Sequence, residues 1–581
     1  MTQTKGAPTQ QPAPTATAAM HVTADTHVSC VTGRKGGDRQ GEQPKILPPH
    51  KLSREQVCTP VNVQAFGELL HGFEKREYLV KGFTEGFRIH YEGGDDSFEI
   101  QNSKSTNLCP QSVDRKIEEE VNAGRIKGPF KTPPFQNFKC SPIALREKST
   151  PGTYRLLHNL SAPYDSRSVN FSIPSQYTTV QYATLKDAIS LVQEVGQGAW
   201  MVKGDIKSAF RIVPLHKSHH HLMGFKWRNN YYYDTCLAMG LAESCRIFET
   251  VSDGLAYIFK TQFGVQRIVK ILDDFCFIDP TFHLNAFSLK VFKSVTALCG
   301  IPIAWDKTSD EPSNCLVFYG AEIDSNAMQV ALPEDKLQRY SALVASTINA
   351  SHISVRELQS LVGKLQYATC VVTAGNAFLH RLRALIPHPA KPFWRLRLTT
   401  QAKKDLKVWQ EFLQNYNGLT IIRQTPIVPS NALNMLSDAS DLGYAAVYGS
   451  EWIMGEWPSQ WKAFPIAVRE LYPIMLIVSI FGEKLKNSRV LFHCDNKAIV
   501  AIINKQSSRD AKIMSLLRPL ILALLVNNIK FKAVYITSAD NNIADSISRL
   551  QVTDSFLSIH GLRLRPYPVP EHLLPDNLQI S

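Results

Sequence analysis

The sequence predicts a chain of mixed α/β structure with several domains, and three observations support this. The chain has 581 residues, 44% of them hydrophobic, which is enough for about three or four cores of ordinary size. Between residues 125 and 323, short β-like runs alternate with helical runs and are separated by Pro and Gly. From Leu433 onward, three strand-like runs precede alternating helices and strands, which is typical of an α/β layer arrangement.

Composition narrows the range of partners and compartments. Lys and Arg total 64 against 51 Asp and Glu, a net charge of +13, which favours a polyanionic partner, although many basic proteins bind no nucleic acid. None of the 11 cysteines forms a C-x-x-C pair, so we expect reduced thiols in an intracellular protein of the cytoplasm or nucleus. The N-terminus has no apolar signal segment and no apolar run could span a bilayer, so the sequence predicts neither secretion nor a membrane partner.

The first part of the chain is predicted to begin with a disordered tail over residues 1–47, which are rich in Thr, Gln, Pro, Ala and Gly. A helical extension is expected over 48–110. The elements predicted after it are an amphipathic helix over 113–123, a strand over 199–203, two strands over 267–272 and 275–278, and a helix over 354–366 with a capping box formed by Ser354 and Glu357.

The C-terminal part is predicted to be equally regular up to residue 550. The expected elements are a strand over 433–437, a hairpin around Gly449 and Ser450, a helix over 466–486, a strand over 489–494, helices over 496–504 and 509–526, a strand over 530–536 and a helix over 542–550. Residues 551–581 are expected to form a loose tail.

Two runs of cationic or titratable residues have competing interpretations. Residues 381–407 carry eight basic residues, one acid and two aromatic residues, which suits either a nucleic-acid track or a solvated basic face. Arg395, Arg397 and Lys404 are the nucleic-acid-binding candidates. The run His219–His221 suggests a metal site, but consecutive strand residues point to opposite faces, so we interpret it as a solvent-exposed loop.

Acidic residues at the ends of predicted strands indicate the chemistry. Asp205 ends one apolar strand, and Asp273 and Asp274 occupy the turn between two others. Phosphoryl transfer by polymerases uses two divalent metals about 3.5–4 Å apart, held by carboxylates. These acids are therefore candidate metal ligands. A solvated Asp-Asp turn is the alternative, although apolar flanks on both sides favour the tip of a buried hairpin.

The order and spacing of these segments resemble the palm motifs of reverse transcriptases. The matching segments are Asp205–Phe210 (DIKSAF) for the first motif, Leu237–Phe248 (LAMGLAESCRIF) for the second, Ile271–Asp274 (ILDD) for the third, Cys299–Lys307 (CGIPIAWDK) for the fourth, Phe318–Gly320 (FYG) for the primer-grip hairpin and Ser141–Arg155 for the fingers hairpin. Two positions depart from the family pattern: Ile271 stands where an aromatic residue is common, and Ala238 where a proline is usual.

The resemblance implies a role for each matching residue. Asp205 and Asp273 would be direct metal ligands, with Asp274 close by. The implied nucleotide-binding residues are Lys148 and Arg155 on the phosphates, Phe210 beneath the sugar, Met239 and Gly240 in the nucleotide and template pocket, and Lys307, which could equally be a structural surface lysine. The implied nucleic-acid contacts of the primer grip are Phe318, Tyr319 and Gly320.

A second set of acids resembles that of ribonuclease H domains. Asp438 and Asp495 end predicted strands, and Glu470 and Asp545 lie in predicted helices. By the resemblance, these four carboxylates would bind the metals of a separate hydrolytic site. The usual histidine loop before the last acid is missing, since residues 535–541 contain no His, and activity could be reduced.

The resemblance covers about residues 50–550, and the sequence looks most like DIRS-type retrotransposons, whose elements use a tyrosine recombinase. It implies a right-hand polymerase with fingers and palm over 111–330 and a thumb or connection over 331–430, followed by a ribonuclease H-like domain over 431–550. The implied function is RNA-directed DNA synthesis with cleavage of RNA in RNA–DNA hybrids. The implied cofactor is Mg²⁺, or Mn²⁺ in its place, with two ions per active site. The implied partners are RNA template, DNA primer, hybrid, dNTPs and a separately encoded recombinase. The alternative is a catalytically degenerate or domesticated nucleic-acid-binding protein.

Overall fold

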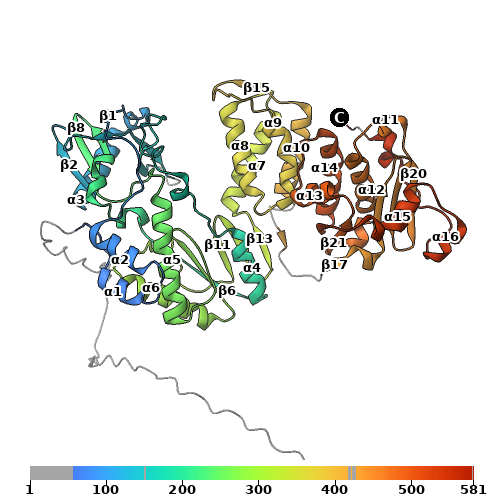
Figure 1. The fold of residues 1–581 in the computed structure, drawn as a ribbon, viewed down its shortest axis with the longest axis horizontal. Coiled ribbons are helices and arrows are strands. Elements are labelled where there is room, and N and C mark those ends of the chain that lie inside the picture. The colour runs from blue at the N-terminus through green and yellow to red at the C-terminus, as the bar shows by residue number, and fades with distance from the viewer. Residues whose placement is uncertain (1–56, 149–151, 416–419, 422–426, 579, 581) are drawn as a thin grey trace, which may run out of the picture. The chain divides into compact units, whose positions relative to one another are not determined.

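The protein is described from a computed structural model that covers residues 57–148, 152–415, 420–421, 427–578 and 580. The tail expected over 1–47 and the start of the helical extension lie outside these residues. The described chain is of mixed α/β structure, as the sequence predicts, with helices packed on several small sheets (Figure 1).

The first part of the chain contains a five-stranded sheet and a separate hairpin. The order of the sheet is β1-β3-β7-β8-β2, and β4 pairs with β5 in the hairpin. The strands are β1 Phe98–Glu99, β2 Ile126–Phe130, β3 Lys139–Cys140, β4 Ile143–Glu147, β5 Tyr154–His158, β7 Gly224–Trp227 and β8 Asn230–Asp234. The helices of this part are α1 Val63–Leu69, α2 Arg76–Glu85 and α3 Pro110–Asn122.

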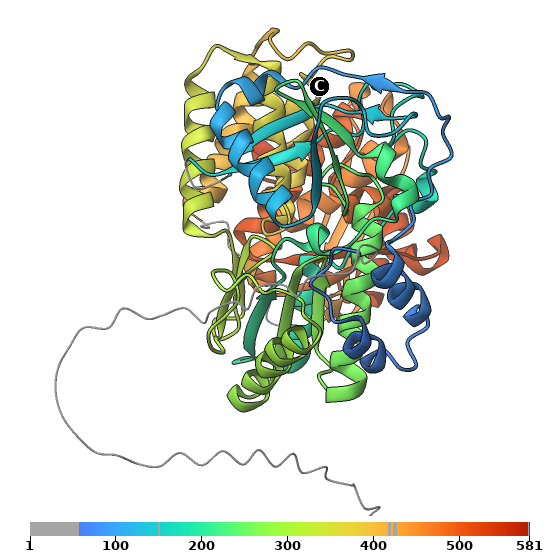
Figure 2. The ribbon, with the colours of Figure 1, turned by 90° about the vertical axis from the view of Figure 1, so that its left-hand side faces the viewer.

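A three-stranded antiparallel sheet, in the order β6-β10-β9, follows. Its elements are α4 Leu185–Val195, β6 Trp200–Asp205, α5 Ser244–Phe263, β9 Ile268–Ile271, β10 Asp274–Asp279 and α6 Phe282–Leu298. The helices around this sheet can be followed in Figures 1 and 2. Alternate residues of β10 contribute to two cores: Phe275 and Phe277 belong to the cluster that α5 and α6 complete, and Cys276 belongs to the cluster that contains α4.

The aromatic core behind β6 leaves no space at Gly204. A Cβ at this position would lie 2.4 Å from the ring of Phe292, which packs in tilted or edge-to-face contact with Phe259, Phe275 and Phe277. A real Cβ essentially never approaches another atom so closely. Glycine therefore allows β6 to lie directly on this cluster, one residue before Asp205.

The middle of the chain is mainly helical, with two small sheets. The elements are β11 Cys315–Phe318, β12 Ala321–Asp324, β13 Gln329–Ala331, α7 Glu334–Asn349, β14 His352–Ser354, α8 Val355–Ala368, α9 His380–Ala384, β15 Arg395–Arg397, α10 Thr400–Asn415 and β16 Thr420–Ile421. Helix α8 begins with the predicted capping box, in which Ser354 and Glu357 bond reciprocally to each other's backbone N–H.

The C-terminal part has a parallel sheet in the order β17-β21-β22 and an antiparallel sheet in the order β18-β19-β20. Its strands are β17 Ile427–Pro429, β18 Met435–Ala439, β19 Gly443–Tyr448, β20 Glu451–Glu456, β21 Arg489–Cys494 and β22 Lys530–Tyr535. Its helices are α11 Ser459–Lys462, α12 Ile466–Phe481, α13 Lys497–Lys505, α14 Ala511–Val526, α15 Asn542–Ser548 and α16 Asp554–Ile559.

Short 3₁₀ helices connect many of these elements. They are η1 Lys104–Asn107, η2 Ser175–Tyr177, η3 Ala209–Ile212, η4 Lys217–Leu222, η5 Thr373–Phe378, η6 Ser430–Leu433, η7 Gly482–Leu485, η8 Ser538–Asn541, η9 Glu571–Leu573 and η10 Pro575–Asn577. Two expectations need correction here. The run His219–His221 lies within η4 and is partly buried, so it is not a solvent-exposed loop.

Within the predicted loose tail over 551–581, the described residues 551–578 are packed against the C-terminal part, so that expectation is wrong. Leu557 of α16 is buried in the cluster that contains Trp452. Further on, Tyr472 donates a hydrogen bond to the carbonyl of Leu573 at 2.8 Å, and Trp461 donates one to that of Pro575 at 3.1 Å. Because large aromatic residues of the C-terminal part need these partners, the segment is a structural part of it.

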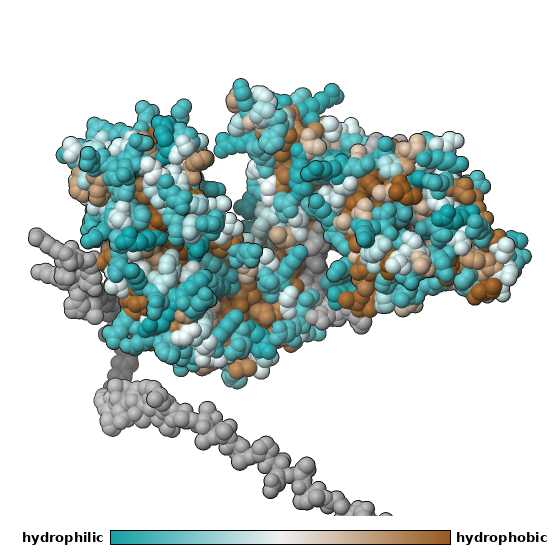
Figure 3. Space-filling view, viewed as in Figure 1, coloured by the Kyte–Doolittle hydropathy of each residue, from teal (hydrophilic) through white to brown (hydrophobic). Residues whose placement is uncertain are grey.

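One face of the surface (Figure 3) is mainly hydrophilic, and the thiols are unpaired in the part of the chain that the structure describes. On the face drawn in Figure 3, hydrophilic residues predominate, with hydrophobic residues scattered among them. Within the residues that the structure describes, no helix has both the length and the apolar character that crossing a bilayer requires. The cysteines described, from Cys58 to Cys494, are free thiols.

Candidate active sites

Two antiparallel strands bring three aspartates together at one end of the β6-β10-β9 sheet. Asp205 is the last residue of β6, and its register partner is Asp274, the first residue of β10. Asp273 lies in the turn just before β10, and its carbonyl accepts a hydrogen bond from the N–H of Ile206 at 3.0 Å. We call Asp205, Asp273 and Asp274 the first carboxylate site. The sequence predicted this hairpin and its acids.

Helix α5 holds the turn that carries Asp273. Leu272 has a left-handed conformation with φ 54°, and both of its backbone polar groups are bonded to α5. Its N–H donates to Glu249 Oε2 at 3.0 Å, and its carbonyl accepts from Ser252 Oγ at 2.5 Å. Lys270 bridges Glu249 at 2.6 Å and Asp253 at 2.7 Å. These contacts fix a strained backbone immediately before a candidate metal ligand.

Asp205 is buried, and a segment beside the free edge of β6 holds its backbone. Its N–H donates to Thr308 Oγ1 at 3.1 Å, and its carbonyl accepts from Ala304 at 2.9 Å. Lys307, in the same segment, places Nζ 3.0 Å from Asp205 Oδ2, with half of its side chain exposed. The predicted fourth motif therefore supplies both backbone support and one cation to the first carboxylate site.

The carboxylates of this site repel one another. Burial and the negative charge of Asp205 raise the pKa of Asp273 above its ordinary value. Burial, a hydrogen bond with Asp205 and the charge of Asp273 raise the pKa of Asp274 to about 7. Acids that are so close together and so difficult to ionise suit the binding of a divalent cation, which would neutralise them.

The predicted nucleotide-binding residues lie on different elements. Arg155 is exposed on β5 and lowers the pKa of Asp273 through its charge, so it lies within electrostatic range of the first carboxylate site. Lys148 is exposed at the end of the same hairpin. Phe210 is half-buried and packs edge-to-face on Phe248, with the ring centroids 6.0 Å apart. This position allows both the predicted sugar contact and a role in the core.

Met239 and Gly240 form a loop that packs against the β4–β5 hairpin. The carbonyl of Met239 accepts a hydrogen bond from the N–H of His158 at 3.1 Å. A Cβ on Gly240, whose φ is 129°, would lie 1.9 Å from the carbonyl oxygen of His158. Only glycine permits this approach, so the loop and the hairpin form one wall.

The predicted primer-grip residues occupy the β11–β12 turn. Phe318 is buried, while Tyr319 and Gly320 adopt positive φ values of 49° and 75°. The carbonyl of Tyr319 accepts a hydrogen bond from Tyr367 of α8 at 2.6 Å, and that of Gly320 accepts one from Lys336 of α7 at 2.9 Å. The turn is therefore rigid, and Tyr319 is left 45% exposed for contact.

The basic run over 381–407 divides into exposed and buried parts. Arg395 and Arg397 are exposed on β15, and Lys404 is exposed on α10. Arg381 instead forms an ion pair with the buried Asp405 at 2.9 Å. The three candidate residues remain available to a polyanion, whereas Arg381 has a structural partner.

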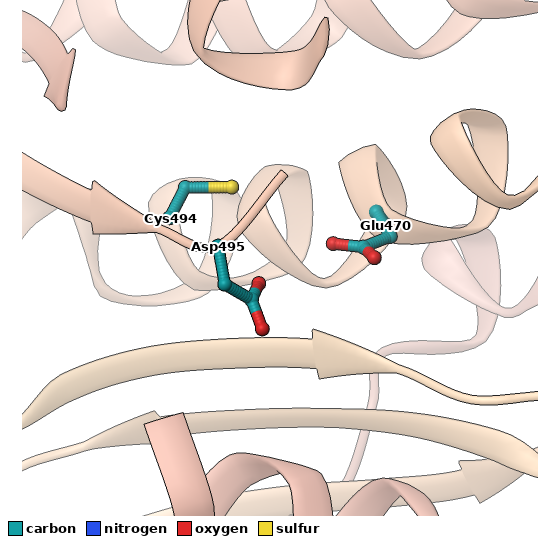
Figure 4. A group of neighbouring side chains, drawn as sticks. All are labelled: Glu470, Cys494 and Asp495. Carbon is teal, nitrogen blue, oxygen red and sulfur yellow. The ribbon is translucent and has the colours of Figure 1, made fainter. Parts of the chain in front are cut away.

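The second set of acids meets where α12 faces the end of β21. Glu470 lies on α12, Asp495 directly follows β21, and their carboxylate oxygens lie within 4.8 Å of one another and of the Cys494 sulfur. Figure 4 shows the Glu470 carboxylate turned towards Asp495. Asp438 is the last residue but one of the neighbouring strand β18 and is buried. We call Asp438, Glu470, Asp495 and Asp545 the second carboxylate site.

Burial and mutual repulsion perturb this site as well. Burial and the charges of Asp495 and Asp438 raise the pKa of Glu470 to about 8. Burial and the charges of Asp495 and Asp545 raise the pKa of Asp438 to about 6, against a hydrogen bond from Ser548. Asp495 Oδ1 is buried and accepts no hydrogen bond from the residues that the structure describes. The site therefore has unbalanced negative charge that a metal could neutralise.

Asp545 is held differently from the other three acids. It lies on α15 and forms an ion pair with Arg549 at 2.9 Å, with both side chains about half exposed. Ser548, one turn further along, donates to Asp438 Oδ2 at 2.5 Å. In place of the missing histidine loop, Tyr535 lies beneath Lys497, whose Nζ is 4.8 Å from the ring centroid.

Several supporting residues were not found from the sequence. Glu249, Ser252 and Ser548 each contact a site residue or the turn that carries it, but none belongs to a distinctive pattern. Cys494 lies beside Asp495, and a thiol directly before a predicted acid is the one local signal that was available.

Comparisons with known proteins give remote relatives. No family model matches the sequence. Protein P of duck hepatitis B virus, isolate Shanghai/DHBVQCA34, is 24% identical over 236 residues, which are 40% of this chain and 28% of Protein P. Protein P of strain United States/DHBV-16 is 30% identical over 173 residues, 30% of this chain and 20% of that protein. The chain thus spans about a third or less of the length of these curated relatives.

Solved structures of foamy viral protease-reverse transcriptase are also similar. The complex with RNA/DNA hybrid matches with a TM-score of 0.46 and 16% identity, over 90% of this chain and 66% of that chain. A complex of the dRH form with double-stranded DNA matches with the same score and identity, over 84% of each chain.

Proposed function

We propose that the chain is an RNA-directed DNA polymerase with a ribonuclease H-like activity. The observation that carries the proposal is the pairing of Asp205 with Asp274 at the end of two antiparallel strands, with Asp273 in the adjoining turn and Lys307 on Asp205. A second, separate group of four acids supports the nuclease activity.

The chemistry of the donor set fits Mg²⁺ or Mn²⁺ in both sites. Each site offers carboxylate oxygens, the ligands that hard divalent cations prefer, and in each the acids raise one another's pKa. Asp205 and Asp273 would hold two ions with Asp274 close by, and the second carboxylate site would hold its own pair. When bound, the ions would activate the attacking oxygen and neutralise charge on the reacting phosphate.

The residues around the first carboxylate site would orient the substrates. Arg155 and Lys148 would bind the triphosphate by charge, and Phe210 would pack beneath the sugar of the incoming nucleotide. Lys307 holds a proton on Nζ, within reach of Asp205, and could give it to the departing pyrophosphate. The Tyr319–Gly320 turn would support the primer end, and Arg395, Arg397 and Lys404 would bind the duplex backbone.

The second carboxylate site would cleave the RNA strand of a hybrid. Ser548 keeps Asp438 oriented through its hydrogen bond, and Arg549 forms an ion pair with Asp545 that is about half exposed to solvent. With no histidine in residues 535–541, the leaving oxygen would take its proton from water. We therefore expect slower cleavage than in a site that has a general acid.

The biological setting that we propose is a retrotransposon of the DIRS type. Such an element would supply a recombinase from a separate reading frame, and the polymerase would work inside the cell, in the cytoplasm or the nucleus. This part of the proposal rests on the sequence motifs, in particular LAMGLAESCRIFE and ADSISR.

Primer extension on an RNA template tests the polymerase. The full chain, with dNTPs and Mg²⁺, should extend a DNA primer, and Asp205→Asn or Asp273→Asn should remove most of this activity, because a neutral amide is a poor ligand for a hard cation. Template–primer binding should persist in both variants. Asp310→Asn, at an exposed aspartate of the neighbouring segment, is the matched control. Near-normal extension by either site variant would refute the assignment.

A hybrid with labelled RNA tests the nuclease. Asp438→Asn should abolish cleavage and leave DNA synthesis largely intact, whereas the exposed Asp576→Asn should change neither. Loss of both activities in Asp438→Asn would indicate a shared site or a folding defect. A wild-type chain that binds hybrid but neither extends nor cleaves would favour the alternative, a catalytically degenerate or domesticated binding protein.

A further inference from the structure

A partly buried group of charged residues lies beside the proposed nucleotide pocket. Its members are Glu120 of α3, Arg125, His158 of β5, Arg211 of η3 and Asp234 of β8, which we call the Arg211 network. Two guanidinium groups and two carboxylates balance one another in charge. The five residues come from four separate parts of the sequence, and none of the proposed chemical steps uses them.

Arg211 is the centre of this network. Its Nη1 lies 2.7 Å from Asp234 Oδ1, its Nη2 lies 2.7 Å from Glu120 Oε2, and its Nε donates to the same Glu120 oxygen at 2.9 Å. Only 14% of the Arg211 side chain is exposed. A planar guanidinium that is bonded on two sides has a fixed orientation, so the backbone of Arg211 is fixed as well.

The other members extend the network to the β4–β5 hairpin. Asp234 Oδ2 lies 3.0 Å from His158 Nδ1, and His158 Nε2 lies 3.0 Å from the carbonyl of Gly224. Glu120 also pairs with Arg125 at 2.7 Å. Although burial opposes ionisation, Arg211 and His158 hold the pKa of Asp234 below its ordinary value. The carboxylate is therefore ionised and fully engaged at neutral pH.

Three walls of the proposed nucleotide pocket meet this network. Phe210, the proposed sugar contact, is the residue directly before Arg211. The loop of Met239 and Gly240 is joined to it twice, since Arg211 Nη1 donates to the carbonyl of Leu237 at 3.3 Å and His158 donates to that of Met239 at 3.1 Å. The hairpin that carries Arg155 ends at His158.

The network also accounts for a departure in the sequence. Ala238 stands where the reverse transcriptase pattern usually has proline, a residue that would stiffen the loop by fixing φ. Here the loop is held on one side by Arg211 and on the other by the contact of Gly240 with His158. Hydrogen bonds to a buried arginine thus replace covalent stiffness in the chain.

We propose that Arg211 is a positioning residue for nucleotide selection: it holds Phe210, the Met239–Gly240 loop and the β4–β5 hairpin in one fixed arrangement. This inference rests on the proposed polymerase function. Arg211 touches no reacting atom. It acts through Phe210, whose ring can exclude a 2′-hydroxyl only while its backbone cannot retreat.

The test compares Arg211→Lys with Arg115→Met, a control at an exposed arginine of α3. Lysine keeps the positive charge, but its ammonium group cannot donate to Glu120, Asp234 and the Leu237 carbonyl at the same time, as the planar guanidinium does. We expect KM for a dNTP to rise about 10-fold in Arg211→Lys, with kcat within about threefold of wild type. The preference for the dNTP over the matching ribonucleotide should fall about fivefold or more. The control should change none of these quantities.

Other outcomes separate the explanations. Arg211→Lys could instead have a lowered melting temperature and a smaller active fraction, with unchanged KM and unchanged sugar preference. This result would overturn the proposal, because the network would then only stabilise the fold. If Arg211→Lys does not fold, the triple variant Arg211→Met, Glu120→Gln, Asp234→Asn removes the charges together, and the same two readouts apply to it. A wild-type chain that extends no primer would refute the proposed function, and this inference with it.

Discussion

Replacing Glu470 with glutamine keeps the shape of the side chain and removes its charge. In the metal-free protein Glu470 has a pKa of about 8, because it is buried and lies near Asp495 and Asp438. The pKa of Glu470 is higher in the folded than in the unfolded protein. Below about pH 4.5 the carboxyl is therefore protonated in both states and does not destabilise the fold. As the pH rises towards 8, the free energy of unfolding falls, because the unfolded state ionises more readily. The glutamine variant should not suffer this loss.

The size of the effect follows from the shift in pKa. A change in the pKa of Glu470 from its ordinary value of 4.5 to about 8 corresponds to at most about 5 kcal/mol of folding free energy above pH 8. We expect about 2–4 kcal/mol, because neighbouring carboxylates share the repulsion. In EDTA at pH 8.5, Glu470→Gln should therefore unfold about 2–4 °C above wild type, and at pH 5 the two melting temperatures should nearly coincide.

Scanning calorimetry of the full chain in EDTA, with the exposed Glu483→Gln as the control, measures the difference at each pH. Added Mg²⁺ should raise the melting temperature of wild type more than that of Glu470→Gln, and the variant should cleave no RNA in a hybrid while still extending primers. An equal offset at both pH values, or a less stable glutamine variant at pH 8.5, would refute the argument from charge repulsion.

Three further predictions concern the polymerase. Phe210→Val should raise incorporation of a ribonucleotide relative to its deoxynucleotide by at least about 10-fold, a change of about 1.4 kcal/mol in relative barrier, whereas an unchanged ratio with a lowered melting temperature would leave only a core role. Neutralising Arg395, Arg397 and Lys404 should weaken template–primer binding for any sequence. It should also reduce the slope of log binding constant against log salt concentration by up to about one unit per lost phosphate contact. An unchanged slope would favour a solvated basic face. Lys307→Gln should lower kcat about 10-fold or more with little change in dNTP KM, as single-turnover extension would report, and equal rates would mark Lys307 as a surface residue.

Local chemistry made much of this structure predictable. The β9–β10 hairpin, the strand that ends in Asp205 and the capping box of α8 follow from patterns within a few residues of sequence. The strand Arg489–Cys494 has the predicted bounds, since alternation and flanking polar residues mark both ends. The roles of these acids remain predictions, and so do the domain boundaries.

Features that depend on distant residues could not be predicted. Arg211 lies 91 residues from Glu120, and a single arginine in a polar stretch has no pattern that names its partner. The C-terminal segment is predicted from the sequence to be a loose tail, and the structure overturns this. It is ordered because Tyr472 and Trp461 require acceptors that it supplies, and this need is visible only once those rings are buried.

The glycine before Asp205 connects the hydrophobic core to the chemistry. Because the Phe292 ring fills the space where a side chain at residue 204 would be, the depth at which β6 lies is set by aromatic packing. Tolerance to substitution should therefore be low at positions that never meet a substrate: a larger residue at 204, or a differently shaped ring at 292, would displace Asp205 relative to its partner Asp274. A survey of inactive variants would find many of them in this core, with the catalytic acids themselves unchanged.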